Sequence, residues 1–260
     1  MKIITCLKEV PGRDTRYQIS ADQTWINDTD LTLEINECDE YALEESLKLR
    51  EKHGGEVVIL TVGRERAERS IRKGLAMGAD RGILVKDDGR ASSPHAVAAV
   101  LAEVLKEEEE YDLILAGTQS DDYSYAQTGV ILAEYLGLPH ATIVMEIQAH
   151  PGNNAVKALR EMESGRFQWV QTPLPAVLTI QAGISQVRYP SLKGIMQAKR
   201  KEIRKVELGQ LSVDWVALPR IEILKLGFPE TVSKAEMLKG DTETVVSALV
   251  EKLKREAKVL

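Results

Sequence analysis

The chain has 260 residues, of which 43% are hydrophobic, 28% charged and 5% aromatic, and its formal net charge is −6. This length suits one large α/β domain with an extension, or two small domains, and the apolar content is enough for a sizeable core. The negative charge and the few aromatic side chains argue against a nucleic-acid partner. The two cysteines, Cys6 and Cys38, lack CxxC spacing, which fits a reduced cytoplasmic protein. We expect neither a signal peptide nor direct membrane insertion, because no stretch is apolar for long enough.

The first half of the chain alternates between strand and helix patterns. Strands are predicted at residues 2–7, 56–62, 82–85 and 113–116, and helices at 39–52, 65–77, 93–110 and 130–136. The stretch 17–36 is irregular or hairpin-like. The alternation predicts an α/β fold, in which a Rossmann-like parallel sheet has helices on both faces.

The pattern changes after Gly137. Four further strands are predicted at 141–150, 155–162, 167–172 and 176–181, and turn-forming residues between them indicate an antiparallel hairpin addition. No strand pattern continues over 183–208, and a basic cluster at 199–205 in this stretch is typical of a solvated face. A last helix is predicted near 241–258. We therefore expect an α/β domain at 1–182, followed by an extended C-terminal arm and tail at 183–260.

The strongest candidate site lies between the strand at 113–116 and the helix at 130–136. Residues 118–128 are rich in hydroxyls, amides and carboxylates, and they follow the carboxyl end of a strand, where parallel sheets bind ligands. The start of the next helix offers unpaired backbone N–H groups, which suit a phosphate. This junction therefore predicts a nucleotide site.

No Lys or Arg occurs between Lys106 and Lys157, so we expect a phosphate at this site to be held by neutral donors. These donors are backbone N–H groups and the hydroxyls of Ser120, Ser124 and Thr128. The spacing fits simple helix capping equally well, through Asp121, Asp122 and Ser124.

Motifs for catalysis are absent from the sequence. There is no GxGxxG, no GxxxxGK[ST], no HExxH and no GxSxG, and the four histidines have no paired ligand spacing. We therefore expect a nucleotide binder that is not itself an enzyme and holds no metal.

Five stretches together resemble the β subunit of electron transfer flavoproteins. They are Thr5-Cys6-Leu7-Lys8, Asn36-Glu37-Cys38-Asp39 with the helix start that follows, and the stretches 76–82, 116–129 and 188–199. The match spans residues 1 to about 205. The combination of the 188–199 stretch with the loop ending in Gln127-Thr128-Gly129 is specific.

The resemblance implies a heterodimer. Its α subunit carries the redox-active FAD, and the β subunit holds an AMP that has no redox role and helps assembly. The pair takes electrons from dehydrogenases, typically the acyl-CoA dehydrogenases of fatty acid β-oxidation, and passes them to a quinone reductase. The C-terminal arm and tail at 183–260 are expected to contact the α subunit and the dehydrogenase.

The resemblance also implies positions for the binding residues. The AMP contacts fall on Cys6, Asn36, Glu37, Cys38, Asp39, Val62, Gly117, Thr118, Gln119, Ser120, Asp121, Asp122, Tyr123, Ser124, Tyr125, Ala126, Gln127 and Thr128. A leucine that docks on the dehydrogenase matches Leu192, which lies between the turn formers Pro190 and Gly194. That position fits a hydrophobic anchor.

Two departures from the family pattern bear on the cofactor. Cys38 stands where the family often has an aromatic residue near the partner's flavin. Electron-bifurcating members hold a second FAD in place of AMP and have Val where this chain has Thr128. The bulk of Tyr123 and Tyr125 also favours AMP here. Two rivals stay open: a bifurcating β subunit, and a nucleotide-sensing regulatory domain without electron transfer.

Overall fold

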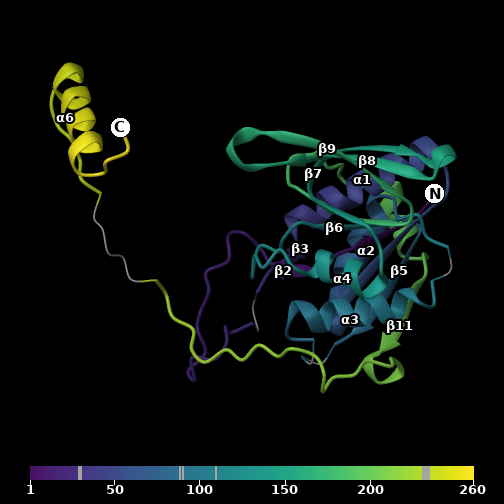
Figure 1. Cartoon of the computed structure of the whole chain (residues 1–260). Helices are drawn as coiled ribbons and strands as arrows, with labels where there is room; N and C mark the ends of the chain where they lie inside the picture. Colours follow the sequence, from purple (N-terminus) through teal and green to yellow (C-terminus); the bar gives the residue numbers. More distant parts are fainter. Residues whose placement is uncertain (29–30, 88, 90, 109, 230–234) are drawn as a thin grey trace. The chain divides into compact units, whose positions relative to one another are not determined.

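The structure is a computed structural model in which residues 1–28, 31–87, 89, 91–108, 110–229 and 235–260 are described. The chain divides into two compact units, residues 1–18 with 27–222 and residues 19–26 with 223–260. The first unit contains a nine-stranded sheet, and the second contains the helix α6 (Thr242–Arg255) (Figure 1). No helix in the described ranges is both long and apolar enough to cross a bilayer.

Parallel strands form the centre of the sheet and confirm the predicted α/β fold. They are β1 (Lys2–Cys6), β4 (Glu56–Gly63), β5 (Arg81–Lys86), β6 (Leu113–Gly117) and β10 (Ala176–Ile180). The order is β5-β4-β1-β6-β10, with β1 parallel to a neighbour on each side. Each strand is a short apolar run buried on both faces, as parallel strands require.

One edge of the sheet is extended by the antiparallel strands that the sequence predicts. They are β7 (His140–His150), β8 (Ala155–Glu161) and β9 (Phe167–Pro173). The assignment of 176–181 to this addition is wrong, because β10 lies between β6 and β7 and runs parallel to both. All five residues of β10 are buried, so it has the continuous apolar pattern of a central parallel strand.

The other edge carries a strand that the sequence analysis missed. Residues after the short helix α5 (Leu192–Ala198) form β11 (Ile203–Glu207), which pairs in parallel with β5. The expectation that no strand occurs over 183–208 is therefore wrong. Only one of the five residues of β11 is buried, so its sequence lacks the apolar run typical of the other strands.

Helices cover both faces of the sheet (Figure 1). One face packs against α1 (Glu37–His53) and α2 (Glu68–Met77), and the other against α3 (Pro94–Leu105) and α4 (Thr128–Leu136). Successive residues of β1 divide between these layers: Ile3 faces the α1 side and Ile4 the α3 side. A separate two-stranded antiparallel sheet joins β2 (Glu9–Pro11) to β3 (Leu33–Ile35). Of these two strands, β3 lies in the stretch 17–36 expected to be irregular or hairpin-like, and β2 precedes that stretch.

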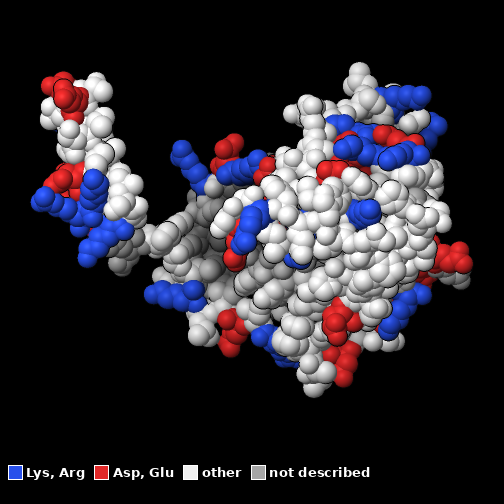
Figure 2. All heavy atoms as spheres, turned by 45° about the horizontal axis from the view of Figure 1, so that its top comes forward, with Lys and Arg blue, Asp and Glu red and all other residues white. Residues whose placement is uncertain are grey.

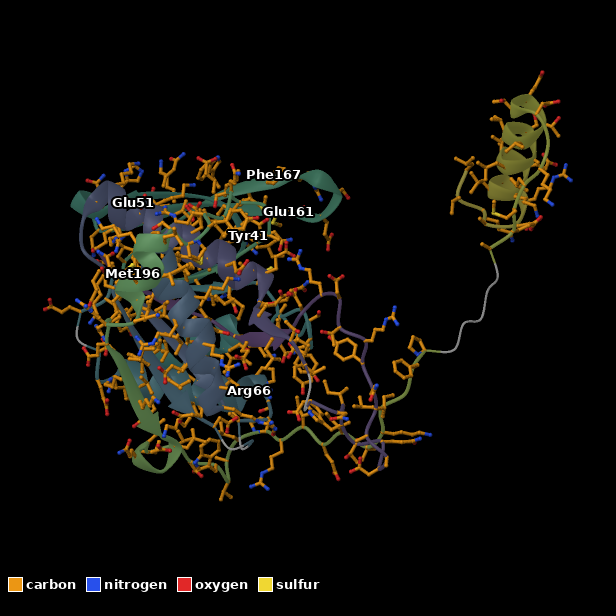
Figure 3. All side chains as sticks on the ribbon, turned by 180° about the vertical axis from the view of Figure 1, so that it is seen from behind. Tyr41, Glu51, Arg66, Glu161, Phe167 and Met196 are labelled. Atoms are coloured by element: carbon orange, nitrogen blue, oxygen red, sulfur yellow. The ribbon has the colours of Figure 1, made fainter. Side chains whose placement is uncertain are left out.

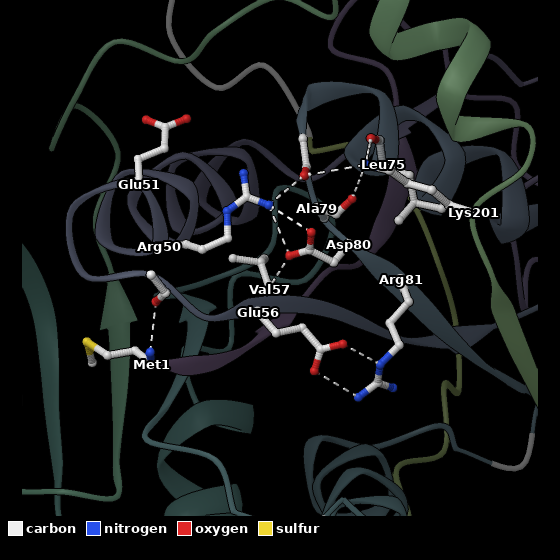
Figure 4. A network of polar contacts seen from close by, with 12 residues as sticks. Met1, Arg50, Glu51, Glu56, Val57, Leu75, Ala79, Asp80, Arg81 and Lys201 are labelled. Atoms are coloured by element: carbon white, nitrogen blue, oxygen red, sulfur yellow. Dashed lines mark hydrogen bonds and ion pairs between the residues drawn. The ribbon is translucent and has the colours of Figure 1, made fainter.

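Polar contacts fasten the helices to the strands on the α1 and α2 side. Arg50 of α1 contacts both carboxylate oxygens of Asp80 at 3.0 Å, and the N–H of Val57 donates to the same carboxylate at 2.8 Å (Figure 4). Lys201 donates to the carbonyls of Leu75 and Ala79, at 3.1 and 2.5 Å, near the C-terminal end of α2. A cation at this end of a helix is favourable.

The basic cluster at 199–205 is not a simple solvated face. Lys201 contacts α2 as above, Arg204 pairs with Glu107 and Glu108, and Lys205 pairs with Glu65 and Glu68. On the face drawn in Figure 2, acidic and basic side chains lie interspersed, in keeping with such pairs. These contacts hold the segment after α5 against the sheet unit.

Candidate nucleotide-binding site

The candidate site lies at the carboxyl ends of β1 and β6. From β1 the chain leads to β4 and β5 on one side, and it then crosses to β6 on the other side of β1. Such a reversal of strand order is where open parallel sheets bind ligands. Three predicted site residues lie at strand ends here: Cys6 is the last residue of β1, Gly117 is the last of β6, and Val62 is the last but one of β4.

Asp39 ties these strand ends together. Its Oδ2 accepts the backbone N–H of Lys8 at 2.8 Å, and its Oδ1 accepts that of Gly117 at 2.7 Å. The side chain is buried, and this burial raises the pKa of Asp39 to about 7. Gly117 is required here, because a Cβ at residue 117 would lie 2.5 Å from Oδ1 of Asp39.

The start of α1 holds the loop that follows β6. The Asn36 side chain donates through Nδ2 to the carbonyl of Gln119 and accepts the N–H of Asp121 through Oδ1, both at 2.9 Å. The N–H of Glu37 donates to the Asp121 carboxylate at 3.2 Å. The predicted residues 36–39 and 117–121, which are far apart in sequence, therefore form one bonded unit.

The backbone of the loop at 118–128 has two residues in the left-handed region. Ser124 and Ala126 have left-handed φ values of 52° and 53°, and the N–H of Ser124 donates to the carbonyl of Ser120 at 2.8 Å. This path places the rings of Tyr123 and Tyr125 in a stack, with centroids 5.4 Å apart and an angle of 16° between the planes. Burial raises the pKa of Tyr123 to about 12, with help from Asp122, so its hydroxyl stays protonated.

The helix-capping interpretation of the loop is wrong. The N-cap of α4 is Gln127, which makes no side-chain hydrogen bond to the helix. The three proposed caps bond elsewhere: Asp121 to Glu37, Asp122 to Lys8, and Ser124 to the Ser120 carbonyl. The N-terminus of α4 is thus left uncapped by its own loop.

Lys8 is the residue that the sequence analysis missed. Its Nζ lies 2.6 Å from Oδ1 of Asp122, 3.3 Å from Oγ of Ser120 and 4.6 Å from the Tyr123 ring centroid. The loop has no cation of its own, but the end of β1 brings one to it. A cation therefore lies beside one of the hydroxyls that the sequence analysis expects to hold a phosphate. The signal in the sequence is that Lys8 directly follows the predicted strand at 2–7, because the carboxyl ends of parallel strands meet at the same edge of a sheet.

Neither cysteine at this site has an activated thiol. Burial, followed by the nearby Asp39 carboxyl, raises the pKa of Cys6 to about 12, and burial also raises the pKa of Cys38. Thiols with raised pKa values are poor nucleophiles at neutral pH. Within the described ranges, no group of three or more His, Cys, Asp or Glu side chains is arranged to hold a metal.

The chemistry of the site fits a nucleotide with a single phosphate. Thr118 has a buried Oγ1 without a hydrogen-bond partner, and the α4 N-terminus adds unpaired N–H groups. The hydroxyls that the sequence analysis expects to hold a phosphate, those of Ser120, Ser124 and Thr128, belong to this loop and the helix start, and the Lys8 ammonium lies beside Ser120. One ammonium and a few hydroxyls suit one phosphate better than a triphosphate.

The predicted docking residue Leu192 lies apart from this loop, at the first position of α5. Its side chain is 83% exposed, and Ser191 caps the helix by accepting the N–H of Gly194 at 3.0 Å. A Cβ at residue 194 would lie 2.3 Å from the carbonyl of Ala76, so the glycine lets α5 lie directly against α2.

Comparisons with known proteins agree on one family. The electron transfer flavoprotein domain matches residues 24–211. The chain is 38% identical over 263 residues to the electron transfer flavoprotein subunit beta of Bradyrhizobium diazoefficiens, covering 100% of both chains. It is 36% identical over 258 residues to the subunit beta of Methylophilus methylotrophus, with 96% and 97% covered, and 36% identical over 250 residues to that of Bacillus subtilis, with 95% and 96% covered. The chain therefore belongs to the β-subunit family of electron transfer flavoproteins.

Proposed function

We propose that this chain is the AMP-holding β subunit of a heterodimer whose α subunit carries the redox-active FAD. The observation that supports AMP most directly is the loop 118–128, folded onto residues 36–39 at the reversal of strand order. There an uncapped helix N-terminus, several hydroxyls and one ammonium lie together. This set of donors suits a monophosphate.

The proposal includes electron donors and an acceptor. The heterodimer takes electrons from acyl-CoA dehydrogenase-type proteins and passes them to a quinone reductase-type acceptor. The segment that contains α5 supports the docking step, because Tyr189, Leu192 and Met196 are 93%, 83% and 73% exposed. Met196 of this helix is labelled in Figure 3. Exposed apolar side chains that cluster in this way mark protein contacts.

The electron-bifurcating alternative, with a second FAD in this chain, is disfavoured by the tyrosine stack. Tyr123 and Tyr125 lie against each other in the loop, with the Lys8 ammonium over Tyr123. An isoalloxazine ring at the loop would compete with these side chains for space. A purely regulatory nucleotide sensor is disfavoured by the family to which the chain belongs.

Co-expression with an α subunit tests the proposal. The purified complex should contain one FAD per heterodimer, measured by its visible absorbance, and should release one AMP on denaturation, measured by chromatography. The chain expressed alone should be colourless. A yellow β chain, or two FAD per complex, would instead support bifurcation. A stable homodimer that takes up no α subunit would support the regulatory alternative.

A further inference from the structure

We propose that Lys8 pairs with the phosphate of the bound nucleotide, and that its ammonium leaves Asp122 to do so. This inference rests on the proposed function, because it specifies how the same loop recognises a nucleoside monophosphate. It adds a residue outside the loop, and it adds an exchange of partners that accompanies binding.

Lys8 is held at its backbone and is exchangeable at its side-chain end. The backbone N–H of Lys8 donates to the buried carboxyl of Asp39 at 2.8 Å, so the backbone of this residue is held in place beside the loop. The ammonium lies 3.3 Å from Oγ of Ser120, one of the hydroxyls expected to hold the phosphate. The Lys8 side chain is 39% exposed, so a ligand at the loop can reach it.

The charges around the loop make such a cation necessary. Asp121 and Asp122 lie in the loop, and Glu37 lies beside it at the start of α1. An anionic phosphate among these carboxyl groups meets repulsion unless a cation lies close by. Arg13, a cation near the start of α1, pairs with Glu37 at 2.7 Å.

Breaking the ion pair between Lys8 and Asp122 costs little free energy. The carboxylate of Asp122 contacts Lys8 at 2.6 Å, and the two side chains are 21% and 39% exposed. An ion pair that is this open to water contributes little net stability. When Lys8 moves to a phosphate, water replaces it at Asp122. A phosphate carries more negative charge than a carboxylate and accepts more hydrogen bonds, so the ammonium gains from the exchange.

The consequence is selectivity for the phosphate over the bare nucleoside. Lys8 contributes to binding of AMP but not of adenosine. A lysine that only held the loop in shape would contribute equally to both ligands. The ratio of the two dissociation constants therefore separates a phosphate contact from a structural role.

The test uses the complex of this chain with its α subunit, depleted of nucleotide by dialysis. Dissociation constants for AMP and adenosine are measured by calorimetry at low salt for the wild type and for Lys8→Met, Asp122→Asn and Lys73→Met. Methionine keeps the backbone N–H that Asp39 accepts and much of the side-chain length. Lys73 is the matched control, because it is a 45% exposed lysine paired with Glu40 on α1.

Lys8→Met should weaken AMP binding roughly tenfold to a hundredfold, the range for a hydrogen bond to a charged group, and should change adenosine binding less than about threefold. Asp122→Asn should tighten AMP binding, since it removes the carboxylate that competes with the phosphate for the Lys8 ammonium. Lys73→Met should affect neither ligand.

Three outcomes would overturn the inference. Equal losses for AMP and adenosine in Lys8→Met would assign a structural role to the lysine, and unchanged or weakened AMP binding in Asp122→Asn would contradict the exchange. Unchanged affinity for both ligands in Lys8→Met, with AMP bound tightly by the wild type, would refute the phosphate contact while leaving the proposed function intact. If the wild-type complex binds no AMP, both proposals fail.

Discussion

Replacing Asp39 by asparagine tests how the strand ends are held together. The carboxylate accepts the N–H groups of Lys8 and Gly117 with different oxygens, at 2.8 and 2.7 Å. Asparagine has nearly the same shape, but it offers one oxygen and one NH₂ group. One of the two buried N–H groups would then face a donor, which costs ~1–3 kcal/mol at every pH.

The pH dependence of this change follows from the pKa of Asp39, which burial raises from 3.8 to about 7. At 1.36 kcal/mol per pKa unit, this rise corresponds to about 4 kcal/mol of the free energy of unfolding. The native carboxyl keeps its proton at pH values where the unfolded chain has lost it. This contribution to stability is therefore fully present below about pH 4, and it is lost as the pH rises through about 7.

Asparagine does not titrate, so the variant lacks this loss. Of the wild type's total loss in the free energy of unfolding, roughly 2–3 kcal/mol falls between pH 5 and pH 8. We therefore expect the free energy of unfolding of the variant, relative to that of the wild type, to rise by this amount from pH 5 to pH 8. Urea unfolding followed by circular dichroism, at pH 5, 6, 7 and 8, measures the difference. Asp122→Asn is the control, since it places an amide on the exposed part of the same site. Parallel pH profiles for the wild type and Asp39→Asn would refute the reasoning.

Three further substitutions test the loop and the docking helix. Gly117→Ala should disrupt the contact with Asp39 at a cost of ~1–3 kcal/mol, because the new Cβ would lie 2.5 Å from Oδ1, and the AMP content of the purified complex should fall. Thr128→Val should weaken AMP retention by ~1.5–3 kcal/mol, and a full AMP complement after dialysis would show that its hydroxyl is not a ligand. Leu192→Ala should reduce affinity for the dehydrogenase by at least ~2 kcal/mol, roughly thirtyfold, with flavin content unchanged. Val216→Ala, at an 89% exposed position outside α5, is the control for Leu192→Ala. Equal electron-transfer rates for the wild type and Leu192→Ala at limiting dehydrogenase would contradict the docking role.

The elements that the sequence predicts well are those with a strong local pattern. The apolar stripes of α1 and α2 and the Ser93-Pro94 start of α3 indicate helices near their observed positions. The loop at 118–128 was found because a buried strand, a polar stretch and a helix follow one another there. Each of these signals is contained within about twenty residues, so no knowledge of distant contacts is needed.

The features that the sequence did not reveal depend on distant partners. The apolar run of β10 predicts a strand, but it does not show whether that strand is parallel or antiparallel to its neighbours. The pairing with β6 and β7, both in parallel, is seen only in the structure. The strand β11 has no apolar pattern, because it contains Arg204 and Lys205. These side chains form ion pairs with acidic residues of other elements, which the local sequence does not show. Lys8 is 114 residues from Asp122, so a search for basic residues near the loop could not find it.

The place of β10 also constrains the order in which the sheet can assemble. β6 and β7 both precede β10 in the chain, yet they are joined only through it. During synthesis, β6 and β7 therefore each keep one unpaired edge until residues 176–180 have left the ribosome. The outer edge of β5 stays unpaired for longer, until β11 has been made. Pairings between such distant segments slow folding and leave intermediates prone to aggregation. The nucleotide loop begins at the end of β6, where the N–H of Thr118 donates to the carbonyl of Ile180 at 2.8 Å, so the loop gains this contact only after β10 has been made.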